Sequence, residues 1–500
     1  MALFATGISG IVAEYILSTL ASYFIGNAVV QFALIVSTML FSMGAGSRLS
    51  KYINRDLLAH FIYIELMLSF LVSFCALMVY IGYGRYTPVL IYVLAICIGV
   101  LIGLEIPLVT RLNNEFEELK VNIASVLEKD YYGSLVGGLF FAFIGIPYLG
   151  LTYTPFALGT LNFIVAFWLF YHLKKSIPKQ QQGRLSLWFG IVGVIIITGL
   201  IFAQPIVQYG DQQKYRDKII YQEETPYQKI TLTQWKDNYS LFINGNLQLS
   251  SFDEFMYHEV LVHPIMQILH QRKNILILGG GDGCAVREVL KYPDVQQITL
   301  VDLDPAMTRL AQTNPVFINM NQRSLNNPKV HIVHQDAFQF IEQSNQLYDA
   351  IIIDLPDPNN VDLNKLYTRE FYFLCQKKLT PNGLLITQAG SPYYATKAFY
   401  CIEKTIQQSG LNTLPLHTQI LTMGEWGWII GAQNKTVNQL KQGLKTIPID
   451  TLSLKWLTPE AIQSLYRFGK PLSDTSDIKV NTMFYPVLYR YYKSGNWEIY

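Results

Sequence analysis

Acidic residues stand at the points in the second half of the chain where a ligand would bind. In the stretch "ILILGGGDGCAVREVL", Ile275 to Leu290, an apolar strand-like run enters a cluster of glycines and continues as a helix. Asp282 lies inside that glycine turn. Because a helix N-terminus attracts phosphate whereas a carboxylate repels it, this turn is not typical of a simple phosphate site. The turn instead indicates a ligand that attracts a carboxylate.

Strand-like and helical stretches alternate from residue 274 onward, which predicts a mostly parallel α/β sheet with helices on both faces. Ligands of such sheets bind at the carboxyl ends of the strands. The strand-like runs are 274–278, 297–301, 329–333, 348–353 and 383–387. The acidic residues that follow the first four runs are Asp282, then Asp302 and Asp304, then Asp336, then Asp354 and Asp357.

These acidic residues have two interpretations. Asp often caps helix N-termini, which also follow strands, and this role accounts for one or two of them, such as Asp304 and Asp336. Four acidic strand ends in one crevice favour a cationic ligand, either a sulfonium nucleoside or an amine. An acidic residue about 20 positions after the glycines, here Asp302, can also hold ribose hydroxyls.

Other ligand classes fit the sequence less well. No G-K-[ST] follows the glycines, which disfavours a P-loop nucleotide site. The pyrophosphate of a nicotinamide cofactor would lie beside Asp282, which electrostatics oppose. A formal net charge of +2 does not indicate a nucleic-acid partner. None of the five cysteines forms a CxxC pair, so we expect no disulfide framework and no zinc site.

A series of short motifs between residues 227 and 430 narrows the choice. They are "YQKI" (227–230), "DEFMYHE" (253–259), "ILILGGGDGCAVREVLKYPDV" (275–295), "LVDLD" (300–304), "QDAFQFI" (335–341), "YDAIIIDLPDP" (348–358) and "LYTREFY" (366–372). In these motifs and their order the chain resembles the spermidine synthases, the polyamine aminopropyltransferases. The apolar first half resembles the membrane domain of a membrane-bound bacterial branch of that family.

The resemblance implies transfer of an aminopropyl group from decarboxylated S-adenosylmethionine, a co-substrate, to putrescine or a related amine. The products would be spermidine or an analogue and methylthioadenosine, with no permanently bound cofactor and no metal. The implied catalytic residues are Asp354 and Tyr257. Implied nucleoside contacts are Gln228, Gly279, Gly281, Asp302, Asp336 and Ala337, and implied amine contacts are His258, Asp282 and Asp357. Without the resemblance, Tyr257 and His258 would be interpreted as packing residues of a helix.

The residue types suit this chemistry. The donor already carries a sulfonium leaving group, so the enzyme must hold an amine in line and remove its proton. Asp354 suits the role of general base, while Asp282 and Asp357 can anchor the distal ammonium.

The chain also departs from the family pattern. The Gly-Pro segment that usually follows Asp-Pro is replaced by "NNVDLN" (359–364), and the ribose carboxylate is Asp302 where the family has Glu. Ala337 stands where Gly is usual. No tyrosine is evident in "LTMGEWGWII" (421–430), where the family places one and where Glu425 and Trp426 stand nearby. With these departures the nucleoside half of the site still fits the family, whereas the identity of the amine acceptor stays open.

A small β unit and one helix are expected ahead of the sheet. Residues 219–250 alternate apolar and polar side chains, and Asn244-Gly245 is a hairpin signal, which predicts an antiparallel unit. Residues 253–270 have helical spacing, with Asp253 as a cap. We expect a small β unit at 210–252 and a Rossmann-like, class I methyltransferase-type domain at 253–500.

The first 209 residues are predicted to form a multi-pass α-helical membrane domain. Hydrophobic residues make up 51% of the chain and charged residues 15%, which is too apolar for an ordinary soluble protein. A span needs about 20 apolar residues. About seven runs qualify: 3–24, 28–47, 57–82, 87–110, 132–150, 155–173 and 185–208. No basic region or small-residue cleavage site indicates a signal peptide.

Two arguments about orientation conflict. Basic residues concentrate in three connections, near residues 48–55, 111–129 and 174–184, and the other connections hold only Arg85. The positive-inside rule puts these basic connections in the cytoplasm, and with seven spans the second half then lies outside. The proposed donor, however, is a cytosolic metabolite with a fixed charge. We therefore expect a protein of the inner cell membrane whose catalytic half faces the cytoplasm.

Several alternatives remain at this stage. The second half could be an S-adenosylmethionine-dependent methyltransferase, or the protein could bind or transport polyamines at the membrane. Glu14, Glu65 and Glu105 lie within apolar runs and indicate either a path for a cation or polyamine, or hydrogen bonding between helices. Expected partners are a polyamine and the lipid bilayer, with no nucleic acid and with homo-oligomer formation open.

Overall fold

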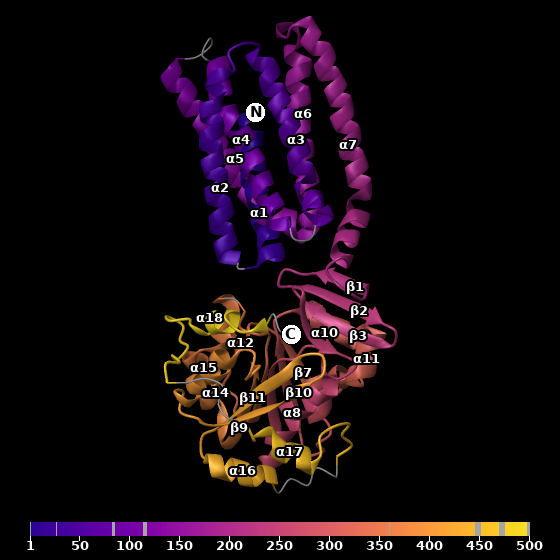
Figure 1. Ribbon diagram of the computed structural model, residues 1–500, viewed down its shortest axis with the longest axis vertical. Coiled ribbons are helices and arrows are strands. Elements are labelled where there is room, and N and C mark those ends of the chain that lie inside the picture. The colour runs from indigo at the N-terminus through magenta and orange to yellow at the C-terminus, as the bar shows by residue number, and fades with distance from the viewer. Residues whose placement is uncertain are drawn as a thin grey trace. The chain divides into compact units, whose positions relative to one another are not determined.

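The computed structural model describes residues 2–26, 28–82, 86–113, 118–359, 361–445, 452–469 and 476–497. The chain divides into two compact units, Met1–Lys218 and Ile219–Tyr500 (Figure 1). Arg85, which bears on membrane orientation, lies outside the described residues. The two units are described separately.

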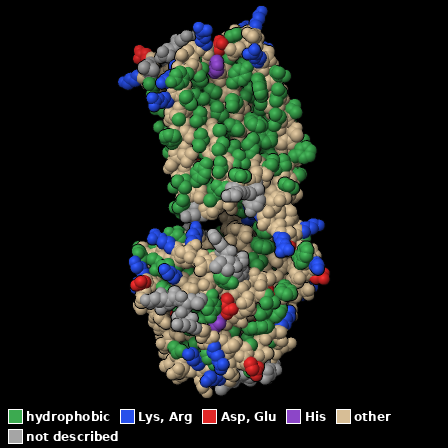
Figure 2. Space-filling view, viewed as in Figure 1, with side chains coloured by type: hydrophobic (Ala, Val, Ile, Leu, Met, Phe, Trp, Pro, Cys, Tyr) green, Lys and Arg blue, Asp and Glu red, His purple; other side chains and the backbone are tan. Residues whose placement is uncertain are grey.

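The first unit is a helical bundle whose sides are covered by hydrophobic side chains (Figure 2). Its α-helices are α1 (Ala2–Ile25), α2 (Ala28–Leu49), α3 (Leu57–Ile81), α4 (Thr87–Asn113), α5 (Leu119–Phe140), α6 (Gly150–Leu173) and α7 (Lys179–Gln212). A π-helix, Phe141–Leu149, joins α5 to α6, and short 3-10 turns follow α2 (Ser50–Tyr52) and α6 (Lys174–Ser176). Within the described residues, six helical stretches are long and apolar enough to cross a membrane.

That number is six because Lys120–Ser176 counts as one 57-residue stretch. Gly150, with φ +63°, interrupts it. A Cβ added to Gly145 would lie 3.1 Å from the side chain of Thr154. In a straight helix, two residues that are nine positions apart are separated by about 13.5 Å along the axis. The chain therefore folds back at Gly150, and α5 and α6 are separate arms of a hairpin.

Close approaches between glycines and neighbouring backbones give the helix directions. Gly133 and Gly137 of α5 approach Phe4 and Ile8 of α1 in the same order, so these two helices are parallel. Gly99 and Gly103 of α4 likewise approach residues 39 and 43 of α2. Among the described helices, direction thus alternates along the chain. The connections after α2, α4 and α6, which carry the basic residues, lie at one end of the bundle, and α7 ends at the other.

Two glutamates are fully buried in the bundle. The hydroxyl of Thr6 lies 3.4 Å from Oε1 of Glu65, and both Glu65 and Glu105 have no exposed surface. Ser9 donates a 2.6 Å hydrogen bond to Asn162, which joins α1 to α6. The contact with Thr6 agrees with the interpretation of hydrogen bonding between helices for Glu65.

The second unit begins with a four-stranded sheet in the order β1-β2-β3-β4. Its strands are β1 (Lys218–Glu224), β2 (Lys229–Trp235), β3 (Asn238–Ile243) and β4 (Asn246–Ser250). Asn244 and Gly245 form the turn between β3 and β4, both with positive φ, and β2–β3 and β3–β4 pair antiparallel. The predicted antiparallel unit and its hairpin are confirmed.

A seven-stranded sheet forms the core of the second unit, in the order β10-β11-β9-β8-β5-β6-β7. Its strands are β5 (Asn274–Gly279), β6 (Gln297–Asp302), β7 (Val330–His334), β8 (Tyr348–Asp354), β9 (Leu379–Gly390), β10 (Asn412–Ile420) and β11 (Gly424–Ala432). The five predicted strands pair parallel, as expected. The antiparallel strands β10 and β11 complete the sheet at its β9 edge and were not predicted.

Helices cover both faces of this sheet because alternate strand residues face opposite sides. One face packs against α8 (Glu254–Ile268), α9 (Cys284–Val289), α10 (Pro305–Thr313), α11 (Pro315–Asn321), α16 (Val437–Lys445) and α17 (Pro459–Leu465). The other packs against α12 (Ala337–Gln343), α14 (Arg369–Lys377), α15 (Thr396–Gln407) and α18 (Leu488–Lys493). A short helix, α13 (Val361–Asn364), precedes α14.

The prediction that the Asp253 side chain caps α8 is wrong. Asp253 stands at the N-cap position of α8 but makes no side-chain bond to the helix. Its carboxylate instead accepts hydrogen bonds from the backbone N–H and the hydroxyl of Thr422, at 2.6 and 2.9 Å. The carboxylate therefore ties the start of α8 to the turn between β10 and β11.

Candidate active site

The strand order reverses between β5 and β8, and the two strands meet there at a glycine. Gly279 pairs with Asp354, the last residue of β8. Gly279 has φ +82°, and a Cβ on it would lie 2.0 Å from the backbone oxygen of Asp354. Only glycine permits this approach, and Gly280 N–H then donates to the same oxygen at 3.0 Å. The glycine turn thereby places Asp354 at the switch point where such sheets bind ligands.

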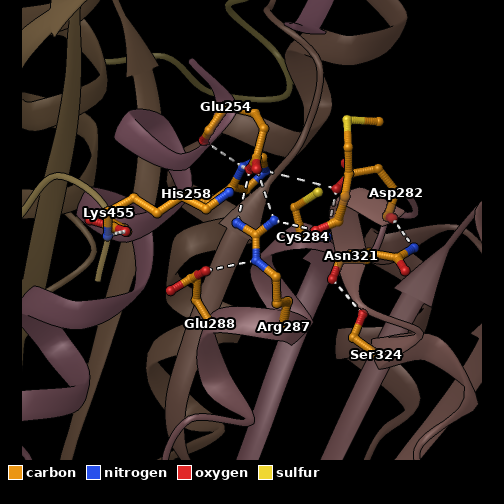
Figure 3. Close-up of polar contacts among 12 residues, drawn as sticks. Glu254, His258, Asp282, Cys284, Arg287, Glu288, Asn321, Ser324 and Lys455 are labelled. Carbon is orange, nitrogen blue, oxygen red and sulfur yellow. Dashed lines mark hydrogen bonds and ion pairs between the residues drawn. The ribbon is translucent and has the colours of Figure 1, made fainter. Parts of the chain in front are cut away.

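The rest of the glycine turn is held by side chains from the following helices (Figure 3). Asn321 donates to the backbone oxygen of Asp282 at 2.8 Å, and Ser324 donates to that of Gly283 at 2.6 Å. The carboxylate of Asp282 accepts from Cys284 N–H at 2.7 Å through Oδ1. The Asp282 side chain therefore has a fixed position beside Asp354.

Tyr257 on α8 donates a 2.8 Å hydrogen bond to Oδ1 of Asp354. The Tyr257 ring lies against Trp428 of β11, with centroids 5.3 Å apart, which fixes its orientation. Burial, with a smaller contribution from Asp282, raises the pKa of Asp354 to about 6, although His258 and Tyr257 act to lower it. A carboxylate with such a pKa is ionised at neutral pH and is a competent base.

His258 lies behind these two carboxylates. Its Nδ1 faces the Glu254 backbone oxygen at 2.8 Å and the Glu254 carboxylate at 2.9 Å, so Nδ1 carries a proton. Its Nε2 lies 3.8 Å from Asp282 and 4.0 Å from Asp354. Burial lowers the pKa of His258, but Glu254 and Asp282 outweigh it and raise that pKa to about 9. The imidazolium is therefore the resident cation of an acidic site.

A buried network supports His258 from below (Figure 3). Arg287 forms a two-pronged ion pair with Glu254, at 2.8 and 2.9 Å, and bonds Glu288 at 2.7 Å. Glu288 in turn bonds His263 at 2.8 Å. Sequence reasoning missed these residues, although the i, i+4 spacing of Glu254 and His258 on a predicted helix was a usable signal.

Among the residues that the structure describes, two groups of side chains have the composition of a metal site. They are Glu254, His258 and Cys284, and His258, Asp282 and Asp354. A metal ligand must lose its proton, but His258 is charged and burial raises the pKa of the Cys284 thiol. Glu254 is already paired with a guanidinium. The donor set therefore fits a hydrogen-bonded network better than a metal centre.

Asp302 occupies the end of β6, on the other side of the glycine turn. Its Oδ1 accepts from Asp304 N–H at 2.9 Å, and a Cβ on Gly281 would lie 2.4 Å from its Oδ2. Burial raises the pKa of Asp302 to about 6. Gly281 thus leaves the space that this carboxylate needs, within reach of a ligand over the glycine turn.

Asp304 and Asp336 are helix caps, as the alternative interpretation predicted. Asp304 accepts from Ala306 N–H at the start of α10, and Asp336 accepts from two N–H groups of α12. The other oxygen of Asp336 pairs with Lys365 at 2.7 Å. Ala337, the first residue of α12, is buried. Capping and ligand binding are compatible for Asp336, because the oxygen that pairs with Lys365 can accept a further hydrogen bond.

Gln228 lies in the turn between β1 and β2. Its backbone N–H donates to the hydroxyl of Thr225, and that hydroxyl donates to Asp304 at 2.8 Å. Gln228 is half-buried. The small sheet therefore brings Gln228 to the β6 side of the crevice.

Asp357 is held by a separate set of donors. Gln388 of β9 donates to its Oδ1 at 3.1 Å, and Tyr492 of α18 donates to its Oδ2 at 2.7 Å. Gln388 also donates to the hydroxyl of Tyr367 at 2.7 Å. Burial raises the pKa of Asp357, and the bonds from Tyr492 and Gln388 act to lower it. No motif in the sequence predicted that Tyr492 lies here.

The sheet order and the glycine turn define a Rossmann-like, methyltransferase-type fold. The Spermine/spermidine synthase domain family matches residues 254–442. A polyamine aminopropyltransferase of Leptospira interrogans is 39% identical over 97% of this chain and 95% of its own length. Polyamine aminopropyltransferase 2 of Aquifex aeolicus is 42% identical over 99% and 98%. The chain therefore belongs to the polyamine aminopropyltransferase family, which confirms the family and the enzyme class predicted from the motifs.

Solved structures give a weaker likeness. A spermidine synthase in complex with the transition state analogue AdoDATO is 24% identical and covers 50% of this chain and 86% of its own, with a TM-score of 0.46. The spermidine synthase of Thermotoga maritima is 23% identical over 50% and 85%, with a TM-score of 0.44.

Proposed function

We propose that this protein transfers the aminopropyl group of decarboxylated S-adenosylmethionine to putrescine or a related diamine. The products are spermidine or its analogue and methylthioadenosine. The observation that carries the proposal is the Tyr257-bonded carboxylate of Asp354 at the switch point, beside Asp282. Both carboxylates keep some exposed surface, 12% for Asp354 and 13% for Asp282, so a cation can reach them.

The nucleoside is proposed to lie over the glycine turn. Asp302 would accept the ribose hydroxyls, since it ends β6 next to Gly281. Asp336 and Ala337 would meet the adenine at the start of α12, and Gln228 would contact the thioether side. Gly279 keeps the turn close enough for these contacts.

The reaction requires a neutral amine. Asp354 accepts a proton from the attacking ammonium, and the freed lone pair forms a bond to the methylene carbon beside sulfur. The carbon–sulfur bond breaks, and its electron pair neutralises the sulfonium. Tyr257 keeps the Asp354 carboxylate oriented during this step, and general base catalysis of this kind is worth about 10²–10⁴ in rate.

His258 is proposed to act through the carboxylates. Its side chain is only 3% exposed, so direct contact with the amine is less favoured than a positioning role. The imidazolium limits the build-up of negative charge around Asp282 and Asp354 in the empty site. Glu254 fixes the ring so that Nε2 points toward both.

The first unit is proposed to be a multi-pass domain in the inner cell membrane, with the catalytic unit in the cytoplasm. Its helices are long and apolar enough to span a bilayer. Because α7 ends away from the basic connections, this orientation places those connections outside, against the positive-inside rule. The proposal rests on the donor, a charged cytosolic metabolite that crosses membranes poorly.

A product assay on the detergent-purified full-length protein tests the function. Decarboxylated S-adenosylmethionine is supplied with 1,3-diaminopropane, putrescine, cadaverine or spermidine, and methylthioadenosine release is measured. We expect release that depends on both substrates and a new polyamine of matching mass. In a parallel assay with S-adenosylmethionine, methyl transfer without aminopropyl transfer in the first assay would overturn the proposal and support the methyltransferase alternative. Amine binding without either transfer would support a binding or transport protein.

A further inference from the structure

The carboxyl end of the chain reaches the amine side of the crevice, although it lies outside the matched family domain, which ends at residue 442. Tyr492 belongs to α18 and is 135 residues from Asp357, yet their side chains are 2.7 Å apart. Tyr492 therefore supplies a hydroxyl to Asp357 from a segment outside the matched domain.

Two residues of β11, Glu425 and Trp426, lie in the strand next to β9. Glu425 of β11 is bonded to His417 of β10, on the neighbouring strand. Trp426 is buried, with 8% of its surface exposed. Its ring lies 6.5 Å from that of Trp497, which in turn lies 4.7 Å from the ring of Tyr492. Trp426 of β11 and Trp497 thus form an aromatic cluster beside Tyr492.

The segment around α18 is firmly attached to the catalytic unit. Asn481 is fully buried and donates to the backbone oxygen of Tyr367 at 2.9 Å. Its side-chain oxygen accepts from Val487 and Leu488 N–H at the start of α18. Trp497 donates to the backbone oxygen of Tyr492 at 2.7 Å. Tyr492 is therefore placed by a packed segment rather than by a chance surface contact.

Asp354 and Asp357 are each paired with a tyrosine, and the two pairs are similar. Each is a carboxylate near the end of β8 that accepts a hydrogen bond from a tyrosine hydroxyl, Tyr257 for Asp354 and Tyr492 for Asp357. Asp357 is half-buried, so an ammonium can still approach an oxygen that holds one donor. A carboxylate oxygen can accept more than one hydrogen bond.

We propose that Tyr492 is a specificity-determining residue that fixes Asp357 as the anchor for the distal ammonium of a diamine acceptor. This inference rests on the proposed function. Tyr492 acts through Asp357 and is a positioning residue, while Trp497 and Trp426 restrict where α18 can lie. The carboxyl-terminal segment thereby selects acceptors with two amines over acceptors with one.

The test compares diamines and monoamines in the Tyr492→Phe variant of the full-length protein. Putrescine carries a distal ammonium and butylamine does not, so only putrescine uses Asp357 fully. We expect the KM for putrescine to rise about ten-fold, the usual scale for a hydrogen bond to a charged group, with kcat little changed. The kinetics with butylamine and the binding of methylthioadenosine stay as in the parent protein.

Two further variants make the result specific. Tyr489→Phe removes a hydroxyl from the same helix that bonds only the exposed Arg490 among the contacts described, and it should leave both amines unaffected. Asp357→Asn should raise the putrescine KM, and adding Tyr492→Phe to it should cost little more, since the two changes remove one interaction.

Two outcomes overturn the inference. Equal effects of Tyr492→Phe on putrescine and butylamine mean that Tyr492 only stabilises the fold, and no effect on either means that it does not position Asp357. Failure of the proposed function looks different, because the parent protein would then release no methylthioadenosine with any amine.

Discussion

The hydroxyl of Tyr257 and the Oδ1 atom of Asp354 are 2.8 Å apart, which connects the first helix of the catalytic unit to the end of its central strand. The bond leaves the second carboxylate oxygen of Asp354 facing Asp282 and His258. Asp354 is therefore oriented before any substrate arrives, as an efficient general base requires.

Replacing Asp354 with Asn should remove turnover while keeping the nucleoside site. Asn has nearly the same size and still accepts a hydrogen bond from Tyr257, but it cannot accept a proton at neutral pH. We expect single-turnover rates to fall by about 10²–10⁴. Calorimetry should still detect methylthioadenosine, because Asp302 and Asp336 are unchanged. Near-normal turnover would remove Asp354 from the mechanism and mean that the amine arrives already neutral.

The pH dependence of kcat/KM should reflect the pKa of Asp354. With a pKa of about 6 in the free protein, Asp354 is the required carboxylate above pH 6 and the inactive acid below it. We expect kcat/KM to fall about ten-fold per pH unit below pH 6. Bound ammonium favours the ionised form, so the acid limb of kcat should lie at lower pH than that of kcat/KM. A flat profile between pH 5 and pH 7 contradicts this assignment.

Replacing Asp282 with Asn should change both the binding of the amine and the pKa of Asp354, and the two effects can be measured separately. The variant loses a negative charge beside the ammonium, so the KM for putrescine should rise about ten-fold or more. Asp282 raises the pKa of Asp354, so its removal should also move the acid limb of kcat/KM to lower pH. Asp237→Asn, an exposed change in the small sheet, serves as the control. Unchanged amine affinity with lost nucleoside binding would show that Asp282 serves the nucleoside.

Asp302 should make nucleoside binding pH-dependent. Burial raises its pKa to about 6, and only the ionised form accepts two ribose hydroxyl bonds. We therefore expect methylthioadenosine to bind more weakly as pH falls through 6, and Asp302→Asn to bind weakly at every pH without that dependence. Calorimetry at pH 5, 6 and 7.5 measures both. Binding of the parent protein that is equally tight at pH 5 would mean that another group holds the ribose.

Local sequence signals predicted much of this architecture because each has a local physical cause. The parallel strands follow from apolar runs bounded by turns, and the Asn244-Gly245 hairpin follows from residues that tolerate positive φ. Asp282 and Asp354 could be placed in one crevice because parallel strands end on the same edge. The antiparallel strands β10 and β11 were missed, because two consecutive strands do not fit the alternation of strand and helix on which the prediction rested.

Contacts between distant segments could not be predicted. Nothing near Asp357 in the sequence indicates that Tyr492 bonds to it, and the ion pair of Glu254 with Arg287 joins two helices that the motifs treat separately. The capping role of Asp253 was mistaken for a related reason, because Thr422 competes for its carboxylate from another part of the fold. Such pairs depend on tertiary packing, which determines side-chain partners after the elements are in place.

The orientation of the helical bundle gives the last prediction. The described helices alternate in direction, so the connection near Lys175 and the end of α7 near Gln212 lie at opposite ends of the bundle. If the catalytic unit is cytoplasmic, Lys175 faces outward, despite the positive-inside rule.

A Lys175→Cys variant, with Cys97 replaced by Ser because it is exposed, should react with a membrane-impermeant maleimide in intact cells. A reporter that is active only in the cytoplasm, fused after the last residue, should be active in the same cells. Labelling only after lysis, together with an inactive reporter, would mean that the basic connections face inward and that the donor must reach a catalytic unit outside.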